Sequence, residues 1–97
     1  MRVIAGKTLR QYAERHPEIS GQLEAWYHDT RRADWATPAD ITRVYRSASI
    51  LANQRVVFDI KGNQYRLVVA INYAQRIVYI RWCGTHSEYD QIDAATV

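Results

Sequence analysis

The chain has 97 residues, of which 47% are hydrophobic and 24% are charged. This length supports one domain with one modest core, and the balance of residue types excludes a disordered or fibrous chain. The longest apolar run, residues 67–71, cannot cross a bilayer, and the first residues lack the apolar stretch of a signal peptide. A single cysteine, Cys83, excludes an internal disulfide framework. We therefore expect a cytoplasmic protein with no membrane partner.

The formal net charge is +3 and the isoelectric point is about 9.2. The basic residues are 11 arginines and 2 lysines. Arginine suits bidentate phosphate contacts and stacking on bases, although a genomic preference for arginine codons gives the same bias. The charge permits a nucleic-acid partner without requiring one.

Helical patterns fill the first third of the chain, after a short edge strand expected at residues 1–5. Apolar residues recur at helical spacing over residues 8–16. Pro17 interrupts this helix, because the residue before a proline avoids the helical conformation. Pro17 then opens a second helix, predicted to reach about residue 32, so that the two form a helical hairpin.

A short third helix is predicted in the middle of the chain. Thr37 is a suitable N-cap, Pro38 takes the first helical position, and Asp40 meets the positive end of the helix dipole. The helix is expected to end near Tyr45. Residues 46–54 are predicted to be a loop.

Three strands are predicted in the second half. The expected strands cover residues 55–60, 64–73 and 77–82, and the expected turns cover residues 61–63 and 74–76. Gly62 and Asn63 tolerate the positive φ that a short hairpin turn needs. The second strand alternates with a period of two. One of its faces carries Tyr65, Leu67, Val69, Ile71 and Tyr73, and the other carries Arg66, Val68, Ala70 and Asn72.

This order of elements, closed by a short final helix, predicts an α+β domain over residues 1–97. We expect a small antiparallel sheet of three to four strands. The helices at about residues 8–16 and 18–32 would pack on one face, where Leu23, Trp26 and Tyr27 meet the apolar side of the second strand.

Two segments resemble a known family. Residues 58–67 read FDIKGNQYRL and residues 85–90 read THSEYD, in a chain with this order of elements. In these segments, in the opening with Lys7 and in the segment around Pro38, the sequence is similar to the HigB branch of the RelE/ParE-like toxins. The resemblance covers nearly the whole chain and implies a RelE-like fold.

The same resemblance implies a function. Members of the family are toxins of type II toxin–antitoxin pairs and are mRNA endoribonucleases that commonly act on ribosome-engaged messages. A HigA-like helix-turn-helix antitoxin neutralises them. Cleavage of this type uses no metal and no cofactor, because the ribose 2′-hydroxyl attacks the adjacent phosphate. The protein must then move protons and stabilise negative charge.

Three residues are candidates for catalysis. His86 suits an acid or base because histidine is the residue type whose ordinary pKa lies near neutrality, although His86 can also cap or orient the last helix. Arg66 is either a phosphate clamp or the partner of Asp59 across the hairpin. Lys61 is either a third catalytic cation or a solvated turn residue. We expect these three to converge at one end of the sheet.

Four further roles are expected around them. Arg81, Tyr89 and Asn63 are candidates for RNA binding, and Asp90 is a candidate for orienting His86. Tyr89 can instead fill the core, and Asp90 can instead be a surface carboxylate.

Metal binding and thiol chemistry have little support. The three histidines are scattered and no ligand spacing emerges. No glycine-rich phosphate loop is present. Cys83 lies three residues before His86, but a buried thiol explains it better than a nucleophile does.

Two other functions remain open. One is a non-enzymatic module that docks a protein partner, and the other is a gyrase-inhibiting toxin of the ParE branch, since the superfamily varies in its catalytic residues.

Overall fold

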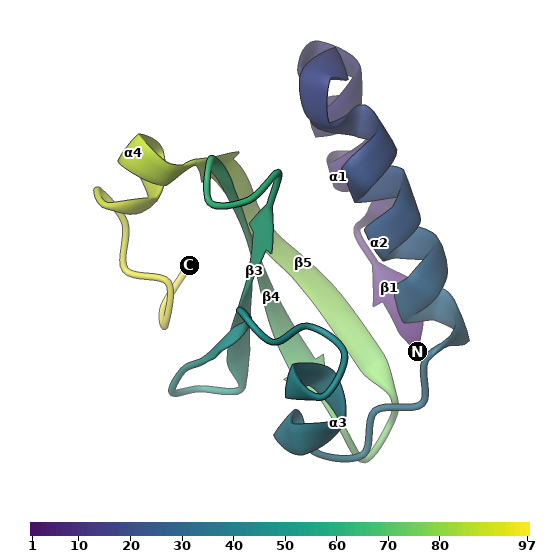
Figure 1. Cartoon of the computed structure of the whole chain (residues 1–97). Coiled ribbons are helices and arrows are strands. Elements are labelled where there is room, and N and C mark those ends of the chain that lie inside the picture. The colour runs from purple at the N-terminus through teal and green to yellow at the C-terminus, as the bar shows by residue number, and fades with distance from the viewer.

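A five-stranded sheet is the centre of the fold, in a computed structural model that describes residues 1–97. The strands are β1 (Arg2–Ile4), β2 (Ser49–Ile50), β3 (Arg55–Ile60), β4 (Tyr65–Asn72) and β5 (Ile77–Thr85). The helices are α1 (Gly6–Arg15), the 3-10 turn η1 (Pro17–Ile19), α2 (Ser20–Arg32), α3 (Pro38–Thr42) and α4 (His86–Tyr89). The strand order is β1-β5-β4-β3-β2 (Figure 1), which confirms the α+β class.

The sheet differs from the predicted one at both edges. β1 is an edge strand, as expected, but Arg2 lies opposite Ile77 in a parallel pair with β5, so the prediction of a purely antiparallel sheet is wrong. A parallel pair needs a long connection, and the helices and the other strands supply it. At the other edge lies β2, which falls within the predicted loop of residues 46–54 and pairs with Val56 and Val57 of β3. Two residues are too few to show a period of two.

The two long helices lie where the pattern predicts them, with shifted ends. α1 begins two residues earlier than expected, directly after Ala5, which has a left-handed φ of 69°. Pro17 opens a 3-10 turn, in which the N–H of Ile19 donates to the carbonyl of His16 at 3.0 Å. α2 therefore begins only at Ser20.

Two other predicted ends are also shifted. α3 stops at Thr42 instead of Tyr45, because the N–H groups of Val44 and Tyr45 both donate to the carbonyl of Ile41 and turn the chain. β5 runs to Thr85, three residues beyond its predicted end, and these extra residues pair with the first part of β4.

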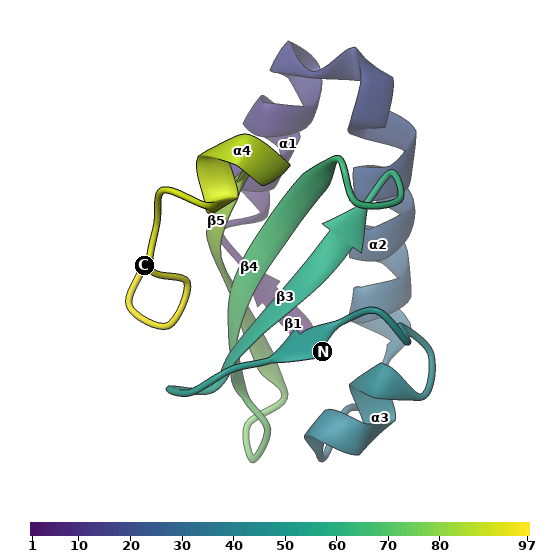
Figure 2. The same ribbon diagram turned by 60° about the vertical axis from the view of Figure 1, so that its left-hand side comes forward.

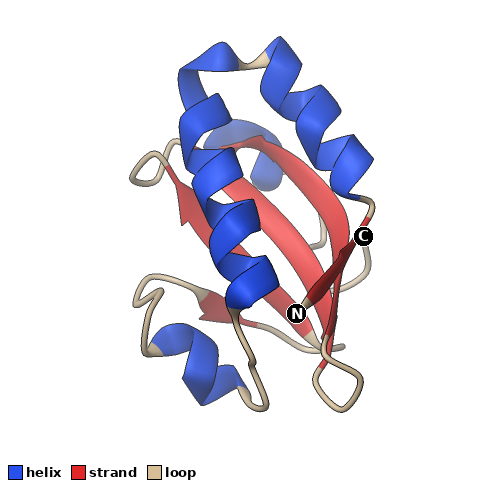
Figure 3. Ribbon diagram, turned by 90° about the vertical axis from the view of Figure 1, so that its right-hand side faces the viewer, coloured by secondary structure: helices blue, strands red, loops and turns tan.

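The main core lies between the sheet and the helical hairpin, as the period-two pattern predicts. Figure 3 shows α1 and α2 covering one face of the sheet. Leu67 has no exposed surface, and Trp26 of α2 meets Phe58 of β3 edge-to-face with ring centroids 5.3 Å apart. Of the three helical residues expected at this contact, Leu23 and Trp26 are buried, while Tyr27 is half-buried. No helix in the structure is long and apolar enough to span a membrane.

The opposite face of the sheet carries a smaller apolar cluster that the sequence pattern does not indicate. Val57 and Val68 are buried there against Ala94. The chain after α4 returns over this face, on the side away from α1 and α2 (Figure 1). Residues 91–97, named the C-terminal segment below, thus complete a second, thinner layer.

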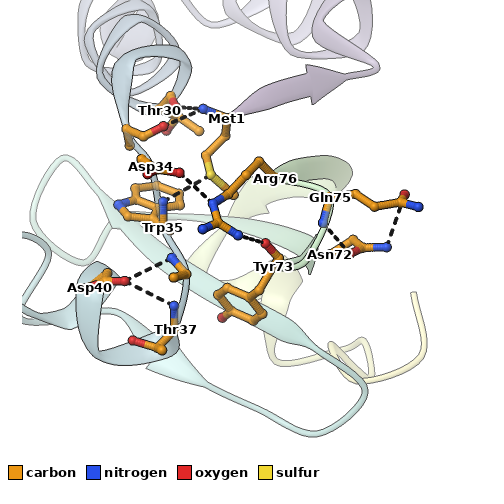
Figure 4. A network of polar contacts seen from close by, with 12 residues as sticks. Met1, Thr30, Asp34, Trp35, Thr37, Asp40, Asn72, Tyr73, Gln75 and Arg76 are labelled. Carbon is orange, nitrogen blue, oxygen red and sulfur yellow. Dashed lines mark hydrogen bonds and ion pairs between the residues drawn. The ribbon is translucent and has the colours of Figure 1, made fainter.

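A network of polar contacts gathers Met1, the end of α2 and the β4–β5 turn at one end of the sheet (Figure 4). The amino group of Met1 donates to the carbonyls of Thr30 at 3.2 Å and Ala33 at 2.5 Å, at the end of α2. The sulfur of Met1 accepts from the N–H of Trp35 at 3.2 Å. Arg76, in the β4–β5 turn, pairs with Asp34 at 2.5 Å. These contacts hold β1 and the turn in place beside the end of α2.

A second polar contact joins the helical corner to the sheet. The hydroxyl of Tyr65 donates to Oε2 of Glu18 at 2.5 Å, across from η1 to β4. This hydrogen bond is the main cause that lowers the pKa of Glu18 below its ordinary value.

Replacement of Leu67 by alanine tests the main core. Because the side chain is fully buried between sheet and helices, Leu67→Ala should lower the free energy of unfolding by about 2–5 kcal/mol. Val44, which is 71% exposed, is the control, and Val44→Ala should change it by less than about 0.5 kcal/mol. Denaturant unfolding measures both, and a loss below about 0.5 kcal/mol for Leu67→Ala would mean that the face assignment is reversed.

Replacement of Glu18 by glutamine tests the contact with Tyr65 through its pH dependence. A carboxylate whose pKa is lowered by folding stabilises the protein above its unfolded pKa, and the stabilisation disappears as the pH falls through the folded pKa. Glu18→Gln should therefore unfold more easily than the unmodified chain at pH 7, and the difference should shrink as the pH falls below about 4.5. Glu14→Gln, an exposed change of the same charge, serves as the control. A difference that is independent of pH would contradict the assignment.

Candidate active site

Arg66 lies on the face of β4 that is turned away from the main core. The strand register places it directly opposite Asp59 of β3, and Nε of Arg66 pairs with Oδ1 of Asp59 at 3.2 Å. The Arg66 side chain is only 12% exposed. Its Nη1 donates to the carbonyl of Asn63 at 2.7 Å. The guanidinium is thus fixed by an anion on one side and by the β3–β4 turn on the other.

His86 is the first residue of α4, and a capping box holds that helix in place. The N–H of Glu88 donates to Oγ1 of Thr85 at 3.2 Å, and the N–H of Thr85 donates to Oε1 of Glu88 at 2.8 Å. The second of these bonds is the main cause that lowers the pKa of Glu88. The N–H of His86 donates to the carbonyl of Gln64 at 2.9 Å. Figure 2 shows α4 beside the β3–β4 turn, at the same end of the sheet.

Gly84 makes this approach possible. A Cβ atom at this position would lie 2.5 Å from the ring of Trp82 and 3.1 Å from Oε1 of Glu88. Real Cβ atoms do not come so close to a ring, so only glycine lets Trp82 lie over the strand next to the cap of α4.

The side chains of Arg66 and His86 meet. Nη2 of Arg66 lies 2.8 Å from Nδ1 of His86, and the carbonyl of Asn63 lies 3.2 Å from the same Nδ1. A guanidinium only donates, so Nδ1 accepts in this arrangement and the proton of a neutral ring lies on Nε2. Nε2 is 3.6 Å from Oδ2 of Asp90, and the His86 side chain is 47% exposed. The predicted convergence of these two residues is therefore present in the structure.

Tyr89 lies beside them on α4. Cζ of Arg66 is 5.8 Å from the centre of the Tyr89 ring, which is within reach of a cation–π contact. The same ring lies 6.1 Å from that of Trp82. Tyr89 is half-buried against the second apolar cluster, not in the main core.

The other candidate residues lie farther out. Lys61, with φ of 54°, lines a shallow groove of about 230 Å³ between α2 and β3, and its side chain forms no hydrogen bond with Arg66 or His86. The side chain of Asn63 is exposed, and the contacts with Arg66 and His86 come from its main-chain carbonyl. Arg81 is exposed at a bulge of β5 and donates to the main-chain oxygen of Val97 at 2.9 Å.

Cys83 lies on the opposite side of β5, packed against the main core. Burial raises the pKa of its thiol to about 12, so the sulfur stays protonated and is a poor nucleophile. No three His, Cys, Asp or Glu side chains gather where they would hold a metal ion.

The residues that support the site were not predicted from the sequence. Thr85 and Glu88 have the spacing of a capping box, so this signal was present in the sequence. The main-chain carbonyls of Asn63 and Gln64 gave no signal, because any residue type offers a carbonyl.

Comparison with known proteins adds to this geometry. The sequence model of the HigB toxin family, described as the RelE-like toxic component of a toxin–antitoxin system, matches residues 19–92. The chain is 28% identical over 92 residues to the mRNA interferase toxin HigB of Escherichia coli strain K12. The aligned residues make up 93% of this chain and 88% of that protein. It is equally similar to the mRNA interferase HigB of Shigella flexneri.

A further relative, the mRNA interferase HigB of Escherichia coli O6:H1 strain CFT073, is 22% identical over 94 residues, or 95% of this chain and 91% of that protein. The mixed sheet with its helical cover agrees with a RelE-like fold. The matched region contains both segments that suggested the family from the sequence. The chain therefore belongs to the HigB family, the RelE-like toxic components of toxin–antitoxin systems.

Proposed function

We propose that this toxin is an mRNA endoribonuclease in which the ribose 2′-hydroxyl attacks the adjacent phosphate at Arg66 and His86. The observation that carries the proposal is the 2.8 Å contact between Nη2 of Arg66 and Nδ1 of His86. It places a permanent cation and a titratable group side by side, which a phosphate in this reaction requires. The names of the relatives, all mRNA interferases, support the same substrate.

Arg66 is prepared to bind phosphate oxygens. Nε of Arg66 pairs with Asp59, and Nη1 donates to the carbonyl of Asn63. Nη2 is therefore the donor that faces the ring of His86. A phosphate supplies anionic oxygens that are stronger acceptors for a guanidinium than a neutral imidazole nitrogen. We infer that substrate draws Nη2 away from His86 while Asp59 keeps the guanidinium in position.

This exchange prepares His86 to accept a proton. Once Nδ1 is free of Arg66, it can carry the ring proton and donate to the carbonyl of Asn63, which already lies 3.2 Å away. Nε2 then has a free lone pair toward solvent and can take the proton of the 2′-hydroxyl. The resulting imidazolium is stabilised by Asp90, 3.6 Å from Nε2, and is the proton source available to the leaving 5′-oxygen.

The remaining candidates fit supporting roles. Tyr89 offers a ring beside Arg66 on which a base can stack. The exposed side chain of Asn63 and the cation of Lys61 flank the same turn and can contact the RNA on either side of the reacting phosphate. Arg81 adds a basic group farther along β5.

We also propose the partners and the setting. Membership of the family implies an antitoxin, and we infer a HigA-like helix-turn-helix protein that covers the sheet or the helical hairpin. Its acidic residues would pair with the exposed arginines of this chain, which carries a net charge of +3. Residues 1–97 act as one RelE-like domain in the cytoplasm, on mRNA engaged with the ribosome.

Replacement of His86 by glutamine tests the proton transfer. Glutamine keeps a polar side chain at the start of α4 but cannot exchange a proton, so His86→Gln should lower mRNA cleavage by about 10²–10⁴-fold. The measurement is induction of the chain alone in cells, followed by mapping of mRNA 5′ ends and growth. The matched control is His28→Gln, an exposed histidine on α2, which should keep full toxicity.

Two outcomes would contradict the proposal. Unchanged cleavage by His86→Gln at equal expression removes the proton role of His86. Toxicity with DNA damage and intact mRNA would instead favour the gyrase-inhibiting function.

Replacement of Arg66 separates positioning from charge. Arg66→Ala should lower cleavage by about 10²–10³-fold and weaken RNA binding, because a fixed donor at the phosphate is lost. Arg66→Lys keeps a charge but cannot hold Asp59 and phosphate together, so it should recover only part of the activity. Lys61→Ala should lose less than either, since Lys61 does not contact His86. Cleavage of a purified mRNA–ribosome complex measures all three, and a larger loss for Lys61→Ala than for Arg66→Ala would refute this ranking.

A further inference from the structure

Two arginines meet on the sheet face that carries Arg66, outside the site described above. Nη2 of Arg55 lies 2.8 Å from the main-chain oxygen of Val97, and Nε of Arg81 lies 2.9 Å from the same oxygen. Neither arginine takes part in any of the six ion pairs of the structure. Two guanidinium groups thus converge on one oxygen atom with no acidic side chain beside them.

Arg55 has hydrogen-bonding capacity to spare. Its Nη1 donates to the carbonyl of Asn53 at 3.1 Å, but its Nε is buried and has no acceptor. A buried donor without a partner is unfavourable. A phosphate offers several oxygens in one group, so it can accept from Nε and Nη2 of Arg55 and from Arg81 at the same time. One of those oxygens would then take the position that the oxygen of Val97 has in the structure.

The two arginines are aligned with the candidate active site. Arg55 and Asp59 are four residues apart on β3, so their side chains lie on the same face, away from the main core. This length of strand separates Arg55 from Asp59 by about 13 Å. Asp59 forms the ion pair with Arg66. On β5 a bulge interrupts the pairing with β4: Val68 lies opposite Trp82 and Val69 lies opposite Ile80, so Arg81 has no partner on β4. A bulge of this kind re-aims a side chain, here towards the end of the C-terminal segment.

The C-terminal segment that covers the pair is lightly attached. It forms no strand with the sheet, and Ala94 is its only buried residue. Besides the bonds to Val97, the side chain of Asn53 donates to the carbonyl of Ala95 at 2.9 Å. Its other main-chain hydrogen bonds run from the N–H groups of Gln91 and Ile92 to the carbonyls of Glu88 and Tyr89 in α4, and from those of Thr96 and Val97 to Asp93 within the segment. Such a segment can leave the sheet without breaking a β-ladder.

We propose that Arg55 and Arg81 form a second phosphate-binding site for the RNA backbone, and that the C-terminal segment occupies this site until RNA displaces it. The proposal rests on the proposed ribonuclease function and extends it: the RNA strand runs along this face from Arg66 toward Arg55. The segment competes with RNA for the same two guanidinium groups. Apparent RNA affinity is therefore lowered by the fraction of molecules in which the segment is docked.

The first experiment measures RNA binding in a His86→Gln background, which prevents cleavage. The probe is a fluorescein-labelled single-stranded RNA of about 12 nucleotides, titrated at several salt concentrations. Arg81→Ala should weaken binding and reduce the slope of log Kd against log salt by about 0.7, the value for one phosphate contact with a single strand. The control, Arg10→Ala, removes the same charge from α1 on the other side of the sheet and should leave the slope unchanged.

Arg66→Ala in the same background separates this proposal from the function on which it rests. Weaker binding with Arg66→Ala and an unchanged slope with Arg81→Ala would overturn only the second site. No effect of either change on RNA binding would overturn the ribonuclease proposal as well.

The second experiment tests competition by the C-terminal segment. On addition of the RNA, amide hydrogen exchange at Thr96 and Val97 should become faster, because the turn closed by their bonds to Asp93 loses the packing and the arginine contacts that hold it against the sheet. Ala94→Asp, which places a charge in the apolar cluster and loosens the segment, should raise RNA affinity severalfold at unchanged helical circular dichroism. If Ala94→Asp does not fold, the exchange measurement on the unmodified segment decides. Slower or unchanged exchange at these amides on RNA binding would overturn the competition.

Discussion

The register of the β3–β4 hairpin is the constraint on which both faces of the sheet depend. Lys61 and Gly62 both have positive φ, 54° and 66°, and this tight turn sets Asp59 opposite Arg66. Because side chains alternate along a strand, the same register buries Leu67 and turns Arg66 to the other face. A slip of one residue would bury the guanidinium and expose the leucine. The stability of the core and the position of the candidate catalytic arginine are therefore fixed together.

This constraint also explains how Arg66 can be held and still be available. A side chain that is only 12% exposed needs a partner for its charge, and Asp59 provides one at Nε. The pairing is one-sided, so the guanidinium keeps donors for the ring of His86 or for a phosphate. A carboxylate bound to Nη2 would instead occupy the nitrogen that faces His86. The two alternatives that the sequence left open for Arg66, an ion pair and a phosphate clamp, are thus compatible.

The sequence predicted those parts of the molecule in which a residue type or a periodic pattern is compatible with a single local structure. The period of two on β4 identified both faces, and Pro17 and Pro38 marked the starts of helical segments. The contact of Arg66 with His86 followed from chain connectivity, since β5 must return to the end of the sheet where β4 begins.

The parts it did not predict depend on contacts between distant segments. β1 and β2 have three and two residues, too few to show which strand they pair with or in which direction. The bulge at Arg81 shifts the alternation of β5, so that Ile80 and Cys83 pack on the main core while Trp82 joins the second cluster. Because the residues around Arg81 are apolar on both faces of the strand, the sequence does not show where this shift lies. Lys61 was expected near Arg66 and His86 because its turn lies at the same end of the sheet, but Lys61 lines the groove beside α2.

The candidate active site and the C-terminal segment share Trp82. Its ring lies over Gly84, reaches the ring of Tyr89 and belongs to the apolar cluster that receives Ala94. Departure of residues 93–97, which lie beyond the bonds of Gln91 and Ile92 to α4, would uncover one side of Trp82. The capping box of Thr85 and Glu88 and the carbonyl of Gln64 would still hold the start of α4 in place. An aromatic ring exposed beside Tyr89 is a surface on which a base can stack. Displacement of the segment would therefore free the two arginines and extend the stacking surface next to Arg66 in a single step, with the contact between Arg66 and His86 undisturbed.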